Sequence, residues 1–163
     1  MEFITDSAAA TLSLGRRLGQ TLGPGSLVLM MGCLGAGKTT LVQGLTQGLG
    51  VPPEEYVRSP TFTLINQYQG FHPIFHVDLY RLQSVEEITE LGLEDLDEKK
   101  GVILVEWAEK LLYPNLEGKE ALLWETRPRI EIRIEILTGD RRRLDVNSAG
   151  YHPAERNPLL SLQ

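Results

Sequence analysis

Cysteine is nearly absent from this chain of 163 residues, since Cys33 is its only one, and aromatic residues make up only 7% of it. A single cysteine excludes an intrachain disulfide and a structural zinc site built from several thiolates. Long apolar runs are also missing, because the run at 27–31 is far shorter than the about 20 residues that cross a bilayer. The first residues carry two acids and no basic stretch of the kind that begins a secretory leader. We therefore expect a cytoplasmic chain with no membrane partner.

Positive charge is scarce, with 16 Lys and Arg against 22 Asp and Glu, which gives a net charge of -6. This sign disfavours coating of a nucleic acid, so we expect no DNA partner. Hydrophobic residues (42%) and charged residues (23%) are close to the globular average. Folding of a chain this long buries about 70% of its unfolded surface, which favours one ordinary domain. We expect that domain over residues 1–147 and a loosely ordered tail over residues 148–163.

The pattern of apolar residues predicts alternating strands and helices. The continuous apolar runs at 27–31 and 102–105 are typical of strands buried on both faces. Strict alternation of isoleucine and charged residues at 129–136, followed by 141–146, predicts a late antiparallel pair. A second strand pair is expected at 61–68 and 74–80. Helices are expected at 7–22, 38–49 and 84–93, and the acidic residues 94–98 are expected to form a solvated face.

A glycine-rich segment connects the first predicted central strand to a helix. Residues 32–39 read Gly-Cys-Leu-Gly-Ala-Gly-Lys-Thr and satisfy the pattern G-x-x-x-x-G-K-[ST] completely. Glycines let consecutive backbone N–H groups surround a phosphate, and the helix N-terminus adds its positive end. In such a loop Lys38 bridges the β- and γ-phosphates, Thr39 offers its hydroxyl to Mg²⁺ and Thr40 lies toward the α-phosphate. The alternative is a glycine turn that only caps a helix.

The order of strand, phosphate loop and helix predicts an α/β fold like that of the P-loop NTPases. We expect three layers around a central, mostly parallel sheet, with antiparallel strands late in the chain. Ligands of such sheets bind at the carboxyl ends of the strands. Residues that follow the central strands are therefore the first candidates for chemistry beside the loop.

Two acids follow predicted central strands and are candidates to hold Mg²⁺ or to position the attacking group. Glu106 follows the apolar run at 102–105, and the alternative for it is an exposed acid at a strand end. Asp78 belongs to a polar series with His76 and Tyr80 that interrupts an apolar strand. Buried polar groups are costly unless they are partnered, so a ligand role explains this series. The alternative is that all three side chains lie on a solvent-facing side of the strand, because side chains alternate with period two.

Two further segments carry polar residues of interest. Residues 58–63 read Arg-Ser-Pro-Thr-Phe-Thr and follow the helix after the phosphate loop, where P-loop proteins place segments that respond to the γ-phosphate. Ser59 and Thr61 are candidates for metal or phosphate contact, and the alternative is a proline turn entering a strand. Residues 141–143 are three arginines near a predicted hairpin. They are candidates to contact RNA or a partner, and the alternative is a solvated turn.

Four motifs occur together and in order: the loop at 32–40, Ser-Pro-Thr-Phe-Thr at 59–63, His-Val-Asp-Leu-Tyr-Arg at 76–81 and Glu-Trp at 106–107. In this set the chain strongly resembles the bacterial TsaE (YjeE) family over about residues 5–112. The resemblance implies a small ATPase of tRNA threonylcarbamoyladenosine biosynthesis, the modification of adenosine 37 in tRNAs that read codons starting with A. It also implies that ATP and Mg²⁺ are the cofactors.

The resemblance further implies roles for single residues and for partners. Lys38, Asp78 and Glu106 are then the catalytic residues, and Thr39, Glu106, Asp78 and Thr61 are the residues around the metal. The nucleotide is then bound by Gly35, Ala36, Gly37, Lys38, Thr39, Thr40 and Trp107. Family members act with the carbamoyltransferase TsaD and its partner TsaB, which implies that tRNA is met mainly indirectly. One departure is Cys33, which stands where the family usually has an acid such as Asp.

Three other functions remain as alternatives. A small GTPase is unsupported, because the sequence contains neither N-K-x-D nor D-x-x-G after the metal strand. A small-molecule kinase shares the loop, but it needs an arginine-rich lid and an acceptor pocket that the sequence does not indicate. The third alternative is a non-catalytic module, in which the nucleotide only holds a partner-binding shape, because hydrolysis by members of the resembled family is often weak alone.

Overall fold

The structure is a computed structural model that describes residues 1–98, 101–114, 120–122, 127–151 and 157–159. Its strands are β1 (Glu2–Thr5), β2 (Leu27–Met31), β3 (Ile65–Gln69), β4 (Pro73–Asp78), β5 (Val102–Glu106), β6 (Leu112–Pro114), β7 (Glu120–Leu122), β8 (Arg129–Ile136) and β9 (Arg142–Ala149). Its helices are α1 (Ala8–Gly19), α2 (Lys38–Gly48), α3 (Val85–Glu90), α4 (Leu93–Glu98) and the 3-10 helix η1 (Ala108–Leu111). No helix in these ranges is long and apolar enough to span a bilayer.

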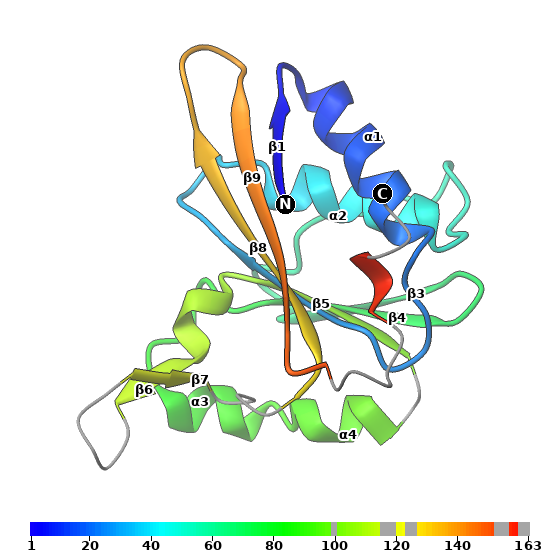
Figure 1. The fold of residues 1–163 in the computed structure, drawn as a ribbon. Coiled ribbons are helices and arrows are strands. Elements are labelled where there is room, and N and C mark those ends of the chain that lie inside the picture. Colours follow the sequence, from blue (N-terminus) through cyan, green and yellow to red (C-terminus); the bar gives the residue numbers. More distant parts are fainter. Residues whose placement is uncertain (99–100, 115–119, 123–126, 152–156, 160–163) are drawn as a thin grey trace.

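A mixed sheet of seven strands, ordered β1-β9-β8-β2-β5-β4-β3, forms the centre of the fold (Figure 1). Its four middle strands are parallel, because β2 pairs in parallel with both β5 and β8, and β4 pairs in parallel with β5. Antiparallel strands flank this centre, with β3 beside β4, β9 beside β8 and β1 beside β9. The predicted α/β class, with a parallel centre and a late antiparallel pair, is confirmed.

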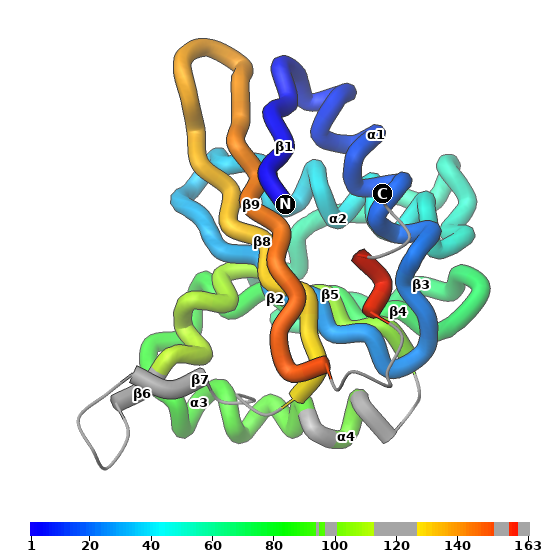
Figure 2. The backbone as a smooth tube through the Cα atoms, in the orientation of Figure 1, coloured from blue at the N-terminus to red at the C-terminus, as the bar shows by residue number. Residues whose placement is uncertain are grey.

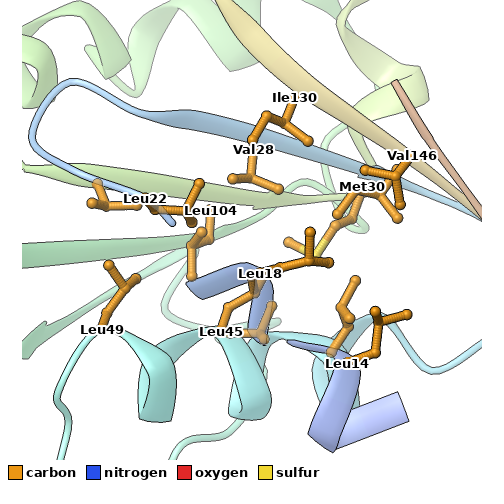
Figure 3. Packing of buried hydrophobic residues seen from close by; sticks show 14 of the residues in the cluster. Leu14, Leu18, Leu22, Val28, Met30, Leu45, Leu49, Leu104, Ile130 and Val146 are labelled. Atoms are coloured by element: carbon orange, nitrogen blue, oxygen red, sulfur yellow. The ribbon is translucent and has the colours of Figure 1, made fainter. Parts of the chain in front are cut away.

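Helices cover both faces of the middle strands (Figure 1). Side chains of β2 alternate between two apolar clusters, Val28 and Met30 in one and Leu27 and Leu29 in the other. The first cluster includes side chains of α1 and α2, such as Leu18 and Leu45 (Figure 3). The second includes residues of α3, α4 and η1. Burial on both faces is why β2 is continuously apolar and shows no alternation.

Several element boundaries differ from those predicted. The strand expected at 61–68 begins only at Ile65, because residues 61–64 form a turn in which Leu64 has φ 66°. The strand expected at 74–80 ends at Asp78. The acidic residues 94–98 belong to the helix α4, in which Asp95 is exposed, as a solvated face requires, and Leu96 is buried in the second cluster.

The two ends of the described chain pack onto the sheet. The short edge strand β1 was not predicted, and it lies beside β9, far away in the sequence (Figure 2). β9 extends to Ala149, two residues into the segment expected as a tail, and Leu159 is buried in the first cluster. Residues 152–156 and 160–163 of the expected tail lie outside the described residues.

Helices α1 and α2 cross at glycines. Gly15 and Gly19 of α1 face Gly44 and Gly48 of α2, and a Cβ at Gly44 would lie 2.2 Å from the carbonyl oxygen of Leu12. The backbones therefore approach more closely than any side chain permits. This crossing fixes the start of α1 beside the phosphate loop, from which α2 begins.

Gly44→Ala is expected to destabilise the protein, because the added Cβ collides with backbone and cannot be relieved by a rotamer change. A loss of about 1–3 kcal/mol is expected, which is a fall of roughly 5 °C in the unfolding midpoint. Gly23→Ala is the control, because nothing lies within 4 Å of its added Cβ. Thermal unfolding measures both, and a higher midpoint for Gly44→Ala, as helix propensity alone predicts, would contradict the close crossing.

Candidate functional site

The phosphate loop has the backbone that its glycines allow. Gly35 and Gly37 have φ of 77° and 105°, in the left-handed region that favours glycine. Gly37 is the N-cap of α2, and no side chain caps the free N–H groups of the first turn. A helix of 11 residues with such an uncapped N-terminus provides donors and a positive dipole end for an anion. The loop geometry is therefore that of a phosphate cradle.

A cavity of about 500 Å³ lies over this loop. It is lined by loop and helix residues, by two residues of the segment after α2, and by the residues at and just after the ends of β4 and β5. Every site residue predicted from the sequence lines it: Gly35, Ala36, Gly37, Lys38, Thr39, Thr40, Thr61, Asp78, Glu106 and Trp107. Leu34, Ser59 and Tyr80 complete the lining.

The two acids lie side by side at the carboxyl ends of β4 and β5, because the strand register pairs Asp78 with Glu106. Each residue is only 2% exposed, and His76 on the same strand as Asp78 is fully buried. The alternative of a solvent-facing side for this strand is therefore wrong for His76 and Asp78, although Tyr80 is 45% exposed. The alternative of an exposed strand-end acid is wrong for Glu106.

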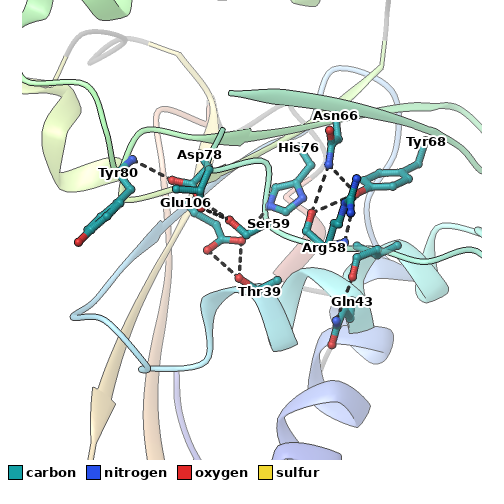
Figure 4. Close-up of polar contacts among 12 residues, drawn as sticks. Thr39, Gln43, Arg58, Ser59, Asn66, Tyr68, His76, Asp78, Tyr80 and Glu106 are labelled. Carbon is teal, nitrogen blue, oxygen red and sulfur yellow. Dashed lines mark hydrogen bonds and ion pairs between the residues drawn. The ribbon is translucent and has the colours of Figure 1, made fainter. Parts of the chain in front are cut away.

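Glu106 connects the phosphate loop to the sheet (Figure 4). The Thr39 hydroxyl donates to both carboxylate oxygens, at 2.9 Å to Oε1 and 3.1 Å to Oε2. His76 Nε2 lies 2.8 Å from Oε1. The hydroxyl expected to meet Mg²⁺ is thus in contact with a carboxylate, as in the metal sites of P-loop proteins.

Asp78 holds the segment after α2 rather than the loop (Figure 4). Its Oδ2 accepts hydrogen bonds from the hydroxyls of Ser59 and Thr61, the latter at 2.8 Å, and these hydroxyls are 2.9 Å apart. Its Oδ1 accepts from the Tyr80 backbone N–H at 2.8 Å. The four predicted metal residues therefore form two hydrogen-bonded groups, Thr39 with Glu106 and Thr61 with Asp78.

The segment at 57–62 is fixed at its start and exposed at its end. Gln43 Nε2 donates to the carbonyl of Val57 at 3.0 Å, and the Tyr68 hydroxyl bonds to both backbone groups of Arg58. Phe62, in contrast, is 85% exposed. Beyond Arg58, the side-chain hydrogen bonds from Ser59 and Thr61 go to Asp78, so a change at that carboxylate removes both of them. Other attachments of the segment are the burial of Pro60 and the contact between Arg81 and the Phe62 ring, 4.8 Å from the ring centroid.

Lys38 is bent back onto its own loop. Its Nζ donates to the carbonyls of Gly32 at 2.5 Å and Cys33 at 2.9 Å, and it lies 3.6 Å from the ring centroid of Trp107. Burial lowers the pKa of Lys38 from its ordinary value, and the negative charge of Glu106 partly opposes this shift. Trp107 itself has φ 60°, which is unusual for a bulky residue. The amino group is therefore beside the cavity, on partners that a phosphate can replace.

The donors around the two acids suit magnesium. They are hydroxyl and carboxylate oxygens, the ligands of a hard cation. Within the described ranges, no three or more His, Cys, Asp or Glu residues form a group that could hold a metal without other ligands. Mg²⁺ is commonly bound by one or two carboxylates together with phosphate oxygens and water. The residues present therefore fit a Mg²⁺ ion that arrives with a nucleotide.

A second cavity, of about 210 Å³, adjoins the loop on the side of Thr40. It is lined by Ser7, Ala8, Thr11, Gly35, Ala36, Gly37, Thr40, Asp140 and Arg142. Arg142 Nε donates to the carbonyl of Ala36 at 3.2 Å, so a solvated turn is the wrong interpretation for this arginine. The contact between Arg142 and Ala36 could not be predicted from the sequence, because 106 positions separate these two residues.

Comparison with known proteins matches these features to one family. The family model described as "Threonylcarbamoyl adenosine biosynthesis protein TsaE" matches residues 5–144. The tRNA threonylcarbamoyladenosine biosynthesis protein TsaE of Nostoc sp. is 47% identical in an alignment of 115 residues that covers 68% of this chain and 69% of that protein. The protein of that name from Streptomyces coelicolor is 42% identical in an alignment of 131 residues that covers 78% of this chain and 80% of that protein.

A solved structure agrees with the sequence relatives. The crystal structure of Bacillus subtilis YdiB superposes with a TM-score of 0.69 at 28% identity, covering 93% of this chain and 86% of that one. This chain therefore belongs to the TsaE family of tRNA threonylcarbamoyladenosine biosynthesis proteins.

Proposed function

We propose that this chain is a Mg²⁺-dependent ATPase that supports formation of the threonylcarbamoyl group on adenosine 37 of tRNAs reading codons that begin with A. It acts with the TsaD–TsaB carbamoyltransferase pair and sustains the turnover of that pair. The observation that supports this most is a single cavity that joins a phosphate loop to two separately hydrogen-bonded acids. One acid contacts the loop, and the other holds a segment that can move.

Each residue around the cavity has a distinct task in this proposal. The loop N–H groups and Lys38 bind the β- and γ-phosphates, and Lys38 exchanges the carbonyls of Gly32 and Cys33 for phosphate oxygens. Thr39 and Glu106 would hold the Mg²⁺ ion that accompanies the nucleotide. Mg²⁺ neutralises charge on the phosphates when it is bound. Asp78 positions Ser59 and Thr61 beside the site of the γ-phosphate.

The segment at 59–62 is the element that reports the nucleotide state. The hydroxyls of Ser59 and Thr61 donate hydrogen bonds to Asp78. A bound nucleotide and its metal ion compete with Asp78 for these two hydroxyls. Binding of Mg²⁺-ATP then orders the segment in a second arrangement and moves the exposed Phe62. We propose that this arrangement creates or closes the surface that meets TsaD and TsaB, and that hydrolysis resets it.

The second cavity is the proposed place for the ribose and base of ATP. It lies on the Thr40 side of the loop, and it offers the polar side chains of Ser7, Thr11 and Arg142. ATP is favoured over GTP because the sequence contains no N-K-x-D pattern for guanine. The net charge of -6 favours a tRNA that is held mainly by the partner proteins.

Repeated tRNA modification tests this function. Purified TsaD and TsaB, supplied with their substrates and excess tRNA, should form many threonylcarbamoyl groups per TsaD only when this chain and ATP are both present. A non-hydrolysable ATP analogue should support at most a single round. Many rounds with the analogue would instead support the alternative of a non-catalytic binding module, whose nucleotide only maintains a shape.

Trp107 fluorescence is expected to change when ATP binds, because the phosphates draw the Lys38 amino group away from the indole ring. Trp124 lies outside the described residues, so the measurement uses a Trp124→Phe background. Titration with Mg²⁺-ATP should shift the emission, and Lys38→Met should remove most of the shift. Emission that stays constant while ATP is shown to bind would contradict the placement of Lys38 over Trp107.

A further inference from the structure

His76 is a fully buried histidine on β4 with one polar partner. Its Nε2 lies 2.8 Å from Oε1 of Glu106, which is itself only 2% exposed. Its Nδ1 is also buried and has no hydrogen-bond partner in the part of the chain that the structure describes. Among the described residues, Glu106 is therefore the one hydrogen-bond partner of the imidazole.

The unpaired nitrogen leaves His76 with one buried polar atom that has no compensating hydrogen bond among the described residues. An ionised carboxylate only accepts hydrogen bonds, so a neutral imidazole in this contact donates through Nε2, and its Nδ1 is then an acceptor without a donor among the described residues. Burial of an unpaired acceptor is unfavourable. His76 lies on the same face of β4 as the apolar residue Ile74 and is paired across the sheet with Leu104, and both of these residues are buried in the first cluster. A leucine could fill this position without leaving a polar atom unpaired.

The carboxylate of Glu106 is the group that gains from the contact. Oε1 is bound by both His76 and Thr39, whereas Oε2 is bound only by Thr39, at 3.1 Å. If a cation takes the Thr39 hydroxyl, the hydrogen bond from His76 keeps Oε1 in place and leaves Oε2 without a protein donor, so that this oxygen can contact the cation. Apart from Thr39 and His76, no side chain is recorded as a hydrogen-bond donor to this carboxylate in the described ranges.

We propose that His76 is a positioning residue, which fixes the rotamer of Glu106 so that one carboxylate oxygen is presented to the metal ion of the nucleotide. This inference rests on the proposed function for the identity of that ion, but the His76–Glu106 contact belongs to the free protein. The sequence pattern only places His76 in a polar series with Asp78 and Tyr80. The contact with Glu106 gives His76 a role of its own.

The first test uses the protein without nucleotide or metal. Nitrogen-15 NMR of the histidine rings should show His76 as the tautomer that carries its proton on Nε2, with a hydrogen-bonded proton that exchanges slowly. Glu106→Gln should move that proton signal, whereas His72→Leu should leave it unchanged. A proton on Nδ1, or a signal that Glu106→Gln does not affect, would overturn the proposal.

The second test separates positioning from a merely structural role. Affinity for a non-hydrolysable ATP analogue is measured in EDTA and over a series of Mg²⁺ concentrations. His76→Leu should leave the affinity in EDTA unchanged and raise the Mg²⁺ requirement about 10-fold to 100-fold, the usual effect of losing a partner of a metal ligand. His76→Gln, which keeps an N–H donor at the end of the side chain, should recover most of that loss. His72→Leu is the control for loss of a histidine elsewhere.

The outcomes distinguish this inference from the proposed function. An unchanged Mg²⁺ requirement in His76→Leu, or a loss that His76→Gln does not reduce, would overturn the positioning role. If His76→Leu fails to fold, the His76→Gln variant and the NMR measurement decide. If the unmodified protein releases no phosphate from ATP, the proposed ATPase fails, while the tautomer and the Mg²⁺ requirement for analogue binding still decide the role of His76.

Discussion

Lys38→Ala is expected to lower phosphate release from ATP by about 100-fold or more and to end repeated tRNA modification. Loss of one preorganised charge at a transferring phosphate has an effect of this size. The Lys38 amino group lies beside the loop on two carbonyls and over Trp107, and no carboxylate of the described residues forms an ion pair with it, so it can move to a phosphate. Phosphate release and ATP affinity should therefore fall together.

The matched control for this variant is Arg17→Ala, which removes one positive charge from the exposed side of α1. It should release phosphate and support tRNA modification as the unmodified protein does. Both variants are compared by thermal unfolding, because Lys38→Ala also removes the cation–π contact with Trp107. A folded Lys38→Ala protein that still sustains many rounds of modification would contradict the nucleotide-dependent account.

Asp78→Asn is expected to reduce Mg²⁺-dependent phosphate release by about 100-fold while ATP binding in EDTA is preserved. The carboxylate accepts two hydroxyl donors at Oδ2 and a backbone N–H at Oδ1. An amide has one acceptor oxygen in place of two and carries no charge, so at least one of these contacts is lost. The segment at 59–62 then loses its tether to β4, although the loop that binds phosphate is untouched.

The control for this change is Asp145→Asn on β9, which removes an acid that lines another cavity. Hydrogen exchange of residues 59–62 measures the tether directly, and Asp78→Asn should accelerate it in the free protein. Equal loss of ATP affinity and hydrolysis in Asp78→Asn would contradict the division of tasks, because it would place Asp78 with Lys38 in phosphate binding. Unchanged hydrolysis would contradict its role altogether.

The residues of the candidate nucleotide site could be predicted from local sequence patterns. The phosphate loop is a contiguous motif whose glycines, lysine and threonine are needed at fixed positions by the geometry of phosphate binding. Asp78 and Glu106 were also predictable, because an acid that ends an apolar strand lies at the carboxyl edge of a parallel sheet. Their register at neighbouring strand ends is what brings them together in the cavity.

Contacts between segments that are distant in the sequence could not be predicted from local patterns. The approach of Arg142 to Ala36 depends on the path of the β8–β9 hairpin. The strand β1 is only four residues long, too short to show a period. The start of β3 was predicted too early because Thr61, Phe62 and Thr63 favour strands, but Thr61 is instead drawn to Asp78 and Leu64 takes a left-handed turn. Tertiary hydrogen bonding overrides local propensity at this point.

The measurement that tests the central claim most directly is phosphate release from ATP and from GTP by the purified chain, alone and with TsaD and TsaB. Lys38→Ala serves as the inactive control. The account predicts release that is selective for ATP, depends on Mg²⁺ and Lys38, and rises when the partner pair is added. Release that stays at the level of Lys38→Ala with the partners present, while ATP still binds, would contradict it and make the nucleotide a structural or allosteric ligand.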